Sequence, residues 1–302
     1  MLLAKRALLN IRNVCSAGIN VSLLSCTVIV LTLCAVLAGC SSRFLYNKLD
    51  TFIVWKVGDF VSLEKEQKAE LKQRLGDQLE FIRKNEMPVI AAGLRDTALE
   101  IETTYVTPDM LDRRYQEAMA LFDKLMLGIV PVSEWFLLSL SDEQIDELFE
   151  NLEEINQEMY EDYSGSTDEE RRKNRNKSAV KFVQGFTGRL SSEQKLLITD
   201  ALASMADSSE QWIDYQREWQ QRFRALIVDQ PPTDQFRAEL TTLFVYPRSF
   251  HTDEYRAKVD ANRLIFNDMM AELINSLSDR QRDRVVDKIE GYAKLLSRLS
   301  ED

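Results

Sequence analysis

The chain has 302 residues, of which 49 are acidic and 38 are basic, so its formal net charge is −11 at pH 7. A chain with this excess of acid is repelled by phosphate backbones, which excludes nucleic acid as a partner class. Gly and Pro are scarce, and apolar residues recur three and four positions apart. This spacing predicts an all-α protein, built as an antiparallel helical array or an elongated bundle.

The first element in chain order is an apolar segment at the N-terminus. Residues 13–39 carry no charge and follow three basic residues. The segment ends at Cys40 in a sequence that resembles a bacterial lipobox. This resemblance implies a cleaved lipoprotein signal peptide over residues 1–39 and lipidation of the Cys40 thiol. The signal-cleavage motif is Leu37, Ala38 and Gly39.

The length of this segment also allows an uncleaved signal anchor that crosses the bilayer. In both cases the positive-inside rule places the chain after Cys40 outside the cytoplasm. Lipoproteins of two-membraned bacteria that stay in the inner membrane carry Asp after the lipidated Cys, whereas this chain has Ser41. The resemblance therefore implies an outer-membrane lipid anchor that faces the periplasm, with the inner membrane as the alternative.

All four cysteines lie in this N-terminal segment or at its end. Cys15, Cys26 and Cys34 leave with the signal peptide, and Cys40 is the one to be acylated. No disulfide and no cysteine nucleophile is then left in the mature chain, so its stability must come from a hydrophobic core.

The rest of the chain is predicted to be helical. Thr107-Pro108 predicts a helix start, and Ser164-Gly165-Ser166 and Pro231-Pro232 predict breaks. The break at 164 divides an N-terminal helical region, 40–163, from a C-terminal one, 164–302, with one continuous domain as the alternative. Residues 46–60 are apolar enough to pack. The predicted helices cover 63–85, 88–105, 107–127 with resumption through 135 after a break near Gly128 and Pro131, 141–163, 168–187, 191–228, 234–245, 252–276 and 278–299.

A motif of Leu, three variable residues and Gln occurs four times, beginning at Leu63, Leu140, Leu190 and Leu277. In the last three copies a serine follows the leucine, and Ser-x-x-Gln forms a helix capping box in which serine and glutamine bond reciprocally to backbone amides. The uneven separations exclude a solenoid. The motif also resembles the Leu-Thr-x-x-Gln motif of small helical periplasmic stress chaperones, which implies chaperone-like activity as an alternative.

A second resemblance is carried by Cys40, Ser41, Ser42, Tyr46, Asn47, Asp50, Trp55, Asp59, Leu63 and Gln67. These residues look like the start of a proteobacterial lipoprotein family of unknown function, DUF6279. The resemblance implies a lipid anchor and a largely helical fold, and it supplies no catalytic residue. In this region we expect Phe52, Trp55, Phe60 and Leu63 to cover an edge of the core. A surface that rests on the membrane or on a partner is the alternative.

Charge is divided sharply between two successive predicted helices. Residues 142–162 contain ten acidic residues and no basic one, and a basic cluster follows them. We expect an antiparallel hairpin whose register is selected by exposed charge pairs worth ~0.2–1 kcal/mol each. A divalent-cation surface and a docking patch for a basic partner are alternatives for the acidic segment. The candidate partner contacts in the basic cluster are Arg171, Arg172, Lys173, Arg175 and Lys177.

The inventory of catalytic side chains is poor. His251 is the only histidine, and the chain has no Gly-x-Ser-x-Gly elbow, no His cluster and no Gly-rich phosphate loop. We therefore predict no catalytic residue, no metal and no cofactor. A carboxylate-dependent envelope hydrolase is the enzyme alternative. The aromatic stripe Trp212, Tyr215, Trp219, Phe223 and Leu226 predicts a helix buried along one side.

Together these features predict a membrane-anchored periplasmic helical lipoprotein that acts as a protein-binding or scaffold module of the cell envelope. The expected partners are the membrane, reached through the N-terminal acyl chains, and another envelope protein. A chaperone-like periplasmic factor is the nearest alternative.

Overall fold

The computed structural model describes residues 46–301, with all their side chains except that of Asp162. This range contains eleven α-helices, one 3-10 helix and no strand, which confirms the all-α prediction. The elements are α4 (Leu49–Val57), α5 (Lys65–Asn85), α6 (Met87–Thr103), α7 (Pro108–Leu138), α8 (Asp142–Ser164), α9 (Asp168–Thr187), α10 (Ser192–Ser204), α11 (Ser209–Asp229), α12 (Thr233–Val245), η1 (Pro247–Phe250), α13 (Asp253–Asn275) and α14 (Asp279–Ser300).

The predicted break at Gly128 and Pro131 is wrong, because α7 continues through both residues. A proline inside a helix removes one backbone hydrogen bond and costs about 3 kcal/mol. The neighbouring Val130 and Val132 are both buried in the largest core cluster, on the side of the helix opposite the exposed Pro131. Their burial offsets the cost of the proline and keeps the chain helical on both sides of it.

The predicted single helix over 191–228 is also wrong, since the chain leaves the helix after Ser204 and starts α11 at Ser209. The side-chain amide of Asn262 on α13 accepts a hydrogen bond from Ala206 N (2.8 Å) and donates one to Ala206 O (2.9 Å). This pairing holds the connection between α10 and α11 in an extended conformation. The polar run Asp207-Ser208-Ser209 is the local sequence signal for the break.

The order of elements repeats once along the chain. The first half runs from α4 to α8, and the second half runs from α9 to α14. Each half begins with one helix (α4 or α9), which is followed by a helix capped by a Leu-x-x-x-Gln motif (α5 or α10). A second copy of the motif caps the last helix of each half (α8 or α14). All four motif copies are capping boxes, including the first, in which Glu64 stands in place of serine. The two motifs of each half meet in space through their glutamines.

In the first half, Gln67 and Gln144 form a reciprocal amide pair. Gln67 Nε2 donates to Gln144 Oε1 (3.0 Å), and Gln144 Nε2 donates to Gln67 Oε1 (2.8 Å). Each amide also donates to a backbone carbonyl just before the other helix, at Ser139 O (2.7 Å) and Ser62 O (2.8 Å). Each glutamine oxygen accepts in addition from its own N-cap amide. The full bonding capacity of both side-chain amides is therefore used.

The second half repeats this arrangement with Gln194 and Gln281. Their reciprocal bonds measure 3.2 Å and 3.0 Å. Gln194 Nε2 donates to Ser276 O (3.1 Å), and Gln281 Nε2 donates to Arg189 O (2.9 Å). We call the Gln67–Gln144 and Gln194–Gln281 arrangements the first and second glutamine clasps.

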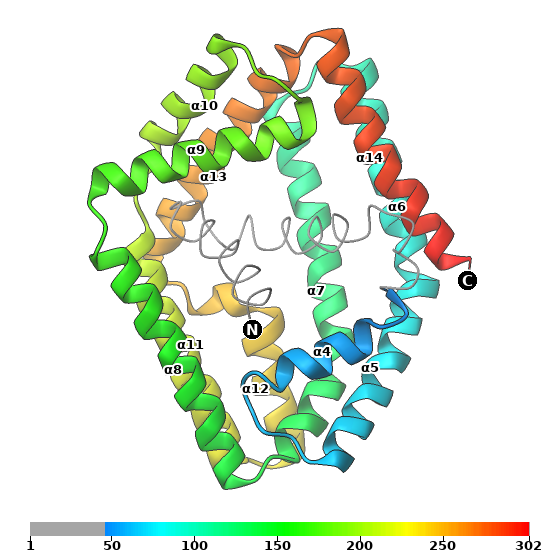
Figure 1. Ribbon diagram of the computed structural model, residues 1–302, viewed down its shortest axis with the longest axis vertical. Coiled ribbons are helices and arrows are strands. Elements are labelled where there is room, and N and C mark those ends of the chain that lie inside the picture. The colour runs from blue at the N-terminus through cyan, green and yellow to red at the C-terminus, as the bar shows by residue number, and fades with distance from the viewer. Residues whose placement is uncertain (1–45, 302) are drawn as a thin grey trace.

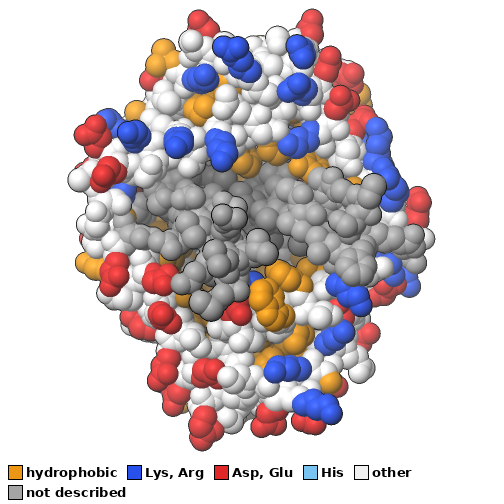
Figure 2. Space-filling view, viewed as in Figure 1, with side chains coloured by type: hydrophobic (Ala, Val, Ile, Leu, Met, Phe, Trp, Pro, Cys, Tyr) orange, Lys and Arg blue, Asp and Glu red, His pale blue; other side chains and the backbone are white. Residues whose placement is uncertain are grey.

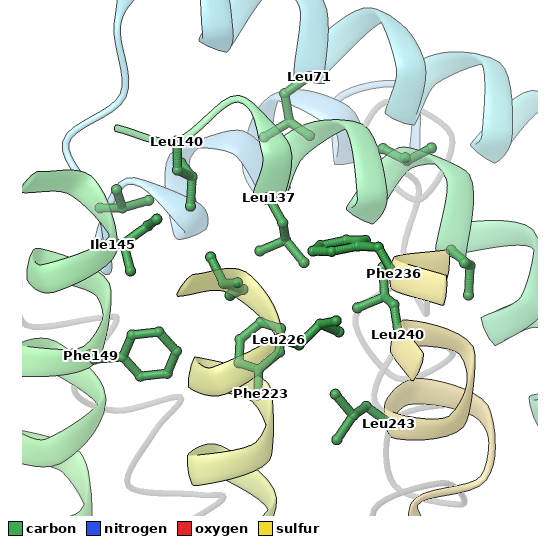
Figure 3. Close-up of a cluster of buried hydrophobic side chains, with 14 of the residues drawn as sticks. Leu71, Leu137, Leu140, Ile145, Phe149, Phe223, Leu226, Phe236, Leu240 and Leu243 are labelled. Atoms are coloured by element: carbon green, nitrogen blue, oxygen red, sulfur yellow. The ribbon is translucent and has the colours of Figure 1, made fainter. Parts of the chain in front are cut away.

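The two halves interlock, because each closing helix packs on the opposite half. Helix α14 lies along α6, and α8 lies along α11, on opposite sides of the array (Figure 1). The largest core cluster therefore joins both halves. Leu137 of α7 and Phe149 of α8 share it with Phe223 of α11 and Phe236 of α12 (Figure 3).

The repeat also places α4 and α9 in matching positions. Each helix directly precedes a clasp, and each crosses in front of the other helices in the view of Figure 1. Helix α4 packs on α5, as α9 packs on α10. One broad face of the molecule thus presents both helices.

We expect Gln144→Ala to lower the free energy of unfolding by about 2–4 kcal/mol, because it removes a buried side-chain amide that bonds to the half-buried Gln67 amide and to the Ser62 carbonyl. Urea unfolding followed by circular dichroism measures this. Gln157→Ala, an exposed change on the same helix, is the matched control and should cost less than about 0.5 kcal/mol. The double variant with Gln67→Ala should be less destabilised than the sum of its two single changes. Equal effects at 144 and 157 would contradict a stabilising clasp.

Candidate functional site

The basic cluster is the first candidate site, and the structure divides it. Arg171 donates to Tyr163 O (2.9 Å) and Ser166 O, and its guanidinium lies 4.4 Å from the centroid of the Tyr163 ring. Arg175 donates to Leu202 O (2.9 Å), and burial is the main cause that lowers its pKa. These two arginines hold the ends of neighbouring helices together. They therefore do not belong to a free contact surface.

The other three predicted contacts do lie at the surface. Arg172, Lys173 and Lys177 are exposed. The exposed Lys181 continues the four-residue spacing of Lys173 and Lys177 along one helical face, and Arg172 lies beside Lys173 at the end of this row. We call these four residues the α9 stripe. None of them forms a salt bridge with a described carboxylate. Sequence analysis missed Lys181, although its spacing from Lys177 was visible.

The predicted acidic–basic hairpin is wrong. Helix α8 packs on α11, and α9 packs on α10 and α14, so the two helices diverge after the turn at 165–167. Phe149 of α8 meets Phe223 of α11 with ring centroids 5.8 Å apart. Burial of such aromatic side chains is worth more than exposed charge pairs, and it decides where α8 lies. A cation of α11 takes the place of one from α9, since Arg224 pairs with Asp146 at 2.9 Å.

The acidic face of α8 is the predicted alternative site for a divalent cation. Among residues 46–301, no group of three or more His, Cys, Asp or Glu side chains has an arrangement that could hold a metal ion. Glu147, on this helix, instead accepts hydrogen bonds from the backbone amide (2.7 Å) and hydroxyl (2.6 Å) of Ser62. Those bonds hold the pKa of Glu147 below its usual range.

His251 lies at the start of α13 within an aromatic cluster. Its ring centroid is 4.6 Å from that of Tyr215 and 4.5 Å from that of Tyr255, and only 7% of the residue is exposed. Burial, followed by the cations Arg248 and Arg256, lowers the pKa of His251 to about 4. The histidine is therefore a neutral packing residue at physiological pH.

The aromatic stripe of α11 packs largely as predicted. Phe223 and Leu226 are buried, and Trp219 stacks on Phe223 at 5.1 Å while its indole N–H donates to Leu243 O at 2.9 Å. Trp212 lines a small pocket between α8 and α11 that also includes Asn156.

The prediction that Phe52, Trp55, Phe60 and Leu63 cover an edge of the core is correct only in part. Leu63 is buried, whereas Phe52 and Trp55 remain 49% and 51% exposed. The helix instead packs the half-buried Ile53, Val54 and Val57 against the core. Phe52 and Trp55 occupy the opposite side, so their assignment to the core is wrong.

The remaining candidate residues, Cys40 and the motif Leu37, Ala38 and Gly39, lie outside the described residues. Among residues 46–301, no helix has the length and apolar character needed to cross a membrane.

Comparison with known proteins identifies a family to which the chain is similar. The profile of the family of unknown function DUF6279 matches residues 59–256, which include both glutamines of the first clasp and the whole of α9. No curated protein and no solved structure matches the chain.

The lowered pKa of His251 predicts a pH-dependent stability. Near pH 7 the histidine is largely neutral in both the folded and the unfolded chain, so its protonation does not lower the free energy of unfolding. As the pH falls from about 6.5 towards 4, the unfolded chain takes up a proton that the folded chain refuses, so about 2–3 kcal/mol is lost.

Urea unfolding at several pH values between 7.5 and 4.5 measures this loss. His251→Phe is the control, because it keeps an aromatic ring between the tyrosines and has nothing to titrate. Its stability should fall less steeply with acid than that of the wild type. Parallel pH curves would show that the pKa of His251 is not depressed.

Proposed function

The chain belongs to the DUF6279 family, whose function is unknown, and we propose that it is a lipid-anchored periplasmic protein that binds another envelope protein through the α9 stripe. The lipobox-like sequence at Leu37 to Cys40 supports the anchor, with lipidation at Cys40 and attachment to the outer membrane. No cofactor is part of this proposal.

The α9 stripe is the observation that carries the binding role. The chain has more acidic than basic residues, yet the four exposed cations of the stripe form no salt bridge within the described part of the chain. Cations that the fold leaves unpaired are available to carboxylates of another protein. Such a contact raises the association rate and the specificity more than the affinity. The partner is therefore a protein with an acidic surface.

The Leu-x-x-x-Gln motifs support a structural role in preference to a chaperone-like one. The side-chain amides of their glutamines form their hydrogen bonds within the two clasps. The resemblance to helical stress chaperones therefore rests on residues that build the fold, and it identifies no surface for an unfolded client.

Lipidation is tested with Cys40→Ala. Because this change removes the only thiol that the lipobox chemistry can use, we expect loss of palmitate labelling and accumulation of the unprocessed precursor in cells. Normal maturation and normal labelling of Cys40→Ala would show that the lipobox interpretation is wrong.

Partner binding is tested by crosslinking in intact cells followed by mass spectrometry. A photoreactive residue in place of the exposed Asn174, between Lys173 and Lys177 on α9, should capture a reproducible protein with an acidic surface. Reversal of two stripe charges, Lys173→Glu with Lys177→Glu, should lower that recovery about tenfold, since each lost charge pair is worth ~0.2–1 kcal/mol and reversal adds repulsion.

The matched control is Lys195→Glu with Arg280→Glu. Both residues are exposed and, like the α9 stripe, form no salt bridge with a described carboxylate, and the pair changes the net charge by the same amount at sites outside α9. Recovery should stay near the wild-type level in the control, and the melting midpoint should stay near the wild-type value in both variants. An equal loss in the two variants would mean that overall charge, and not the α9 stripe, governs binding.

A further inference from the structure

Helix α4 exposes an aromatic pair on its outer side. The ring centroids of Phe52 and Trp55 lie 5.6 Å apart, and about half of each residue is exposed. Lys56 Nζ lies 4.7 Å from the centroid of the Trp55 ring. Because the inner side of α4 packs against the core, the pair is directed to the outer side of the helix.

Lysines accompany the aromatic pair on the next helix. Lys65, Lys68 and Lys72 of α5 are exposed and follow the spacing of one helical face. Lys72 lies on the α4 side, because its Nζ is 3.9 Å from a carboxylate oxygen of Asp50. Figure 2 shows apolar side chains over α4 and Lys or Arg side chains beside them over α5. We call Phe52, Trp55, Lys65, Lys68 and Lys72 the α4 face.

The α4 face lies a short chain length from Cys40. Tyr46 is buried, and its hydroxyl donates to Leu79 O at 2.7 Å, which fixes the start of the described chain to α5. The six residue steps from Cys40 to Tyr46 span at most about 20 Å, even when fully extended. If Cys40 carries acyl chains, the helices that follow Tyr46 are held close to the membrane surface.

We propose that the α4 face rests on the membrane interface, with Trp55 and Phe52 among the lipid headgroups and the α5 lysines beside lipid phosphates. Tryptophan favours this interface because its ring is apolar and its N–H is polar. Each lysine near an anionic leaflet contributes about 1 kcal/mol. The proposal rests on the lipid anchor, and it sets how the anchored domain is oriented. The acyl chains retain the protein, and the α4 face fixes one side of it against the lipid.

The test uses the full mature protein, reconstituted in vesicles of phosphatidylethanolamine and phosphatidylglycerol that contain brominated acyl chains. Bromine quenches tryptophan fluorescence at short range, and the chain has four tryptophans. We expect quenching in the wild type that is abolished in Trp55→Phe, which keeps an aromatic ring and loses the reporter. Lys65→Glu with Lys68→Glu should reduce quenching at least about twofold. Lys195→Glu with Arg280→Glu, which reverses two exposed charges on α10 and α14, should leave it unchanged.

The acylation state, determined by mass spectrometry, separates the possible failures. A protein that carries no acyl group would overturn both the anchor and the α4 proposal. An acylated protein without quenching, or with quenching that persists in Trp55→Phe, would overturn the α4 proposal alone. A photoreactive residue at position 55 that captures a protein in intact cells, and no lipid, would likewise replace the membrane with a protein partner.

Discussion

The architecture depends on two neutral hydrogen-bonded pairs, the glutamine clasps. The first backbone amides of a helix have no hydrogen-bond partner within that helix. The backbone carbonyls of the segment that leads into the helix also need donors when they are buried. Each clasp provides partners for such amides and carbonyls at two helix starts. In the first clasp, the side-chain amides of Gln67 and Gln144 bond to one another, to the backbone amide at their own N-cap and to a backbone carbonyl just before the other helix. Two helix starts distant in sequence are thereby fixed side by side.

The clasps set which surfaces the protein can offer. Because α4 and α9 each precede a clasp, both are brought to the same face of the array (Figure 1). The two positions are equivalent in the repeat but differ in chemistry. Helix α4 carries Phe52 and Trp55, whereas α9 carries exposed cations such as Lys177. One repeated scaffold thus presents an apolar surface near the start of the described chain and a charged one on its other half.

Local signals predicted much of this fold, and long-range packing decided the rest. The Ser-x-x-Gln boxes were visible because both partners lie three residues apart, but the pairing of Gln144 with Gln67 joins residues that no local pattern connects. The hairpin prediction failed because charge was given more weight than the burial of Phe149. Similarly, the exposure of Trp55 depended on which side of a short helix met the core.

Ionic strength affects the fold and the surface contacts of the protein differently. The clasps are built from neutral amides, so ionic strength has little effect on them, and the interlocked core follows apolar burial. A contact made by the α9 stripe is electrostatic and exposed, and at physiological ionic strength it is screened beyond about 8 Å. Added salt should therefore release a partner held by Lys173, Lys177 and their neighbours while the fold and the proposed acyl anchor stay intact. An interaction that resists salt would have to use apolar contact, and α4, with Phe52 and Trp55, offers such contact on this face.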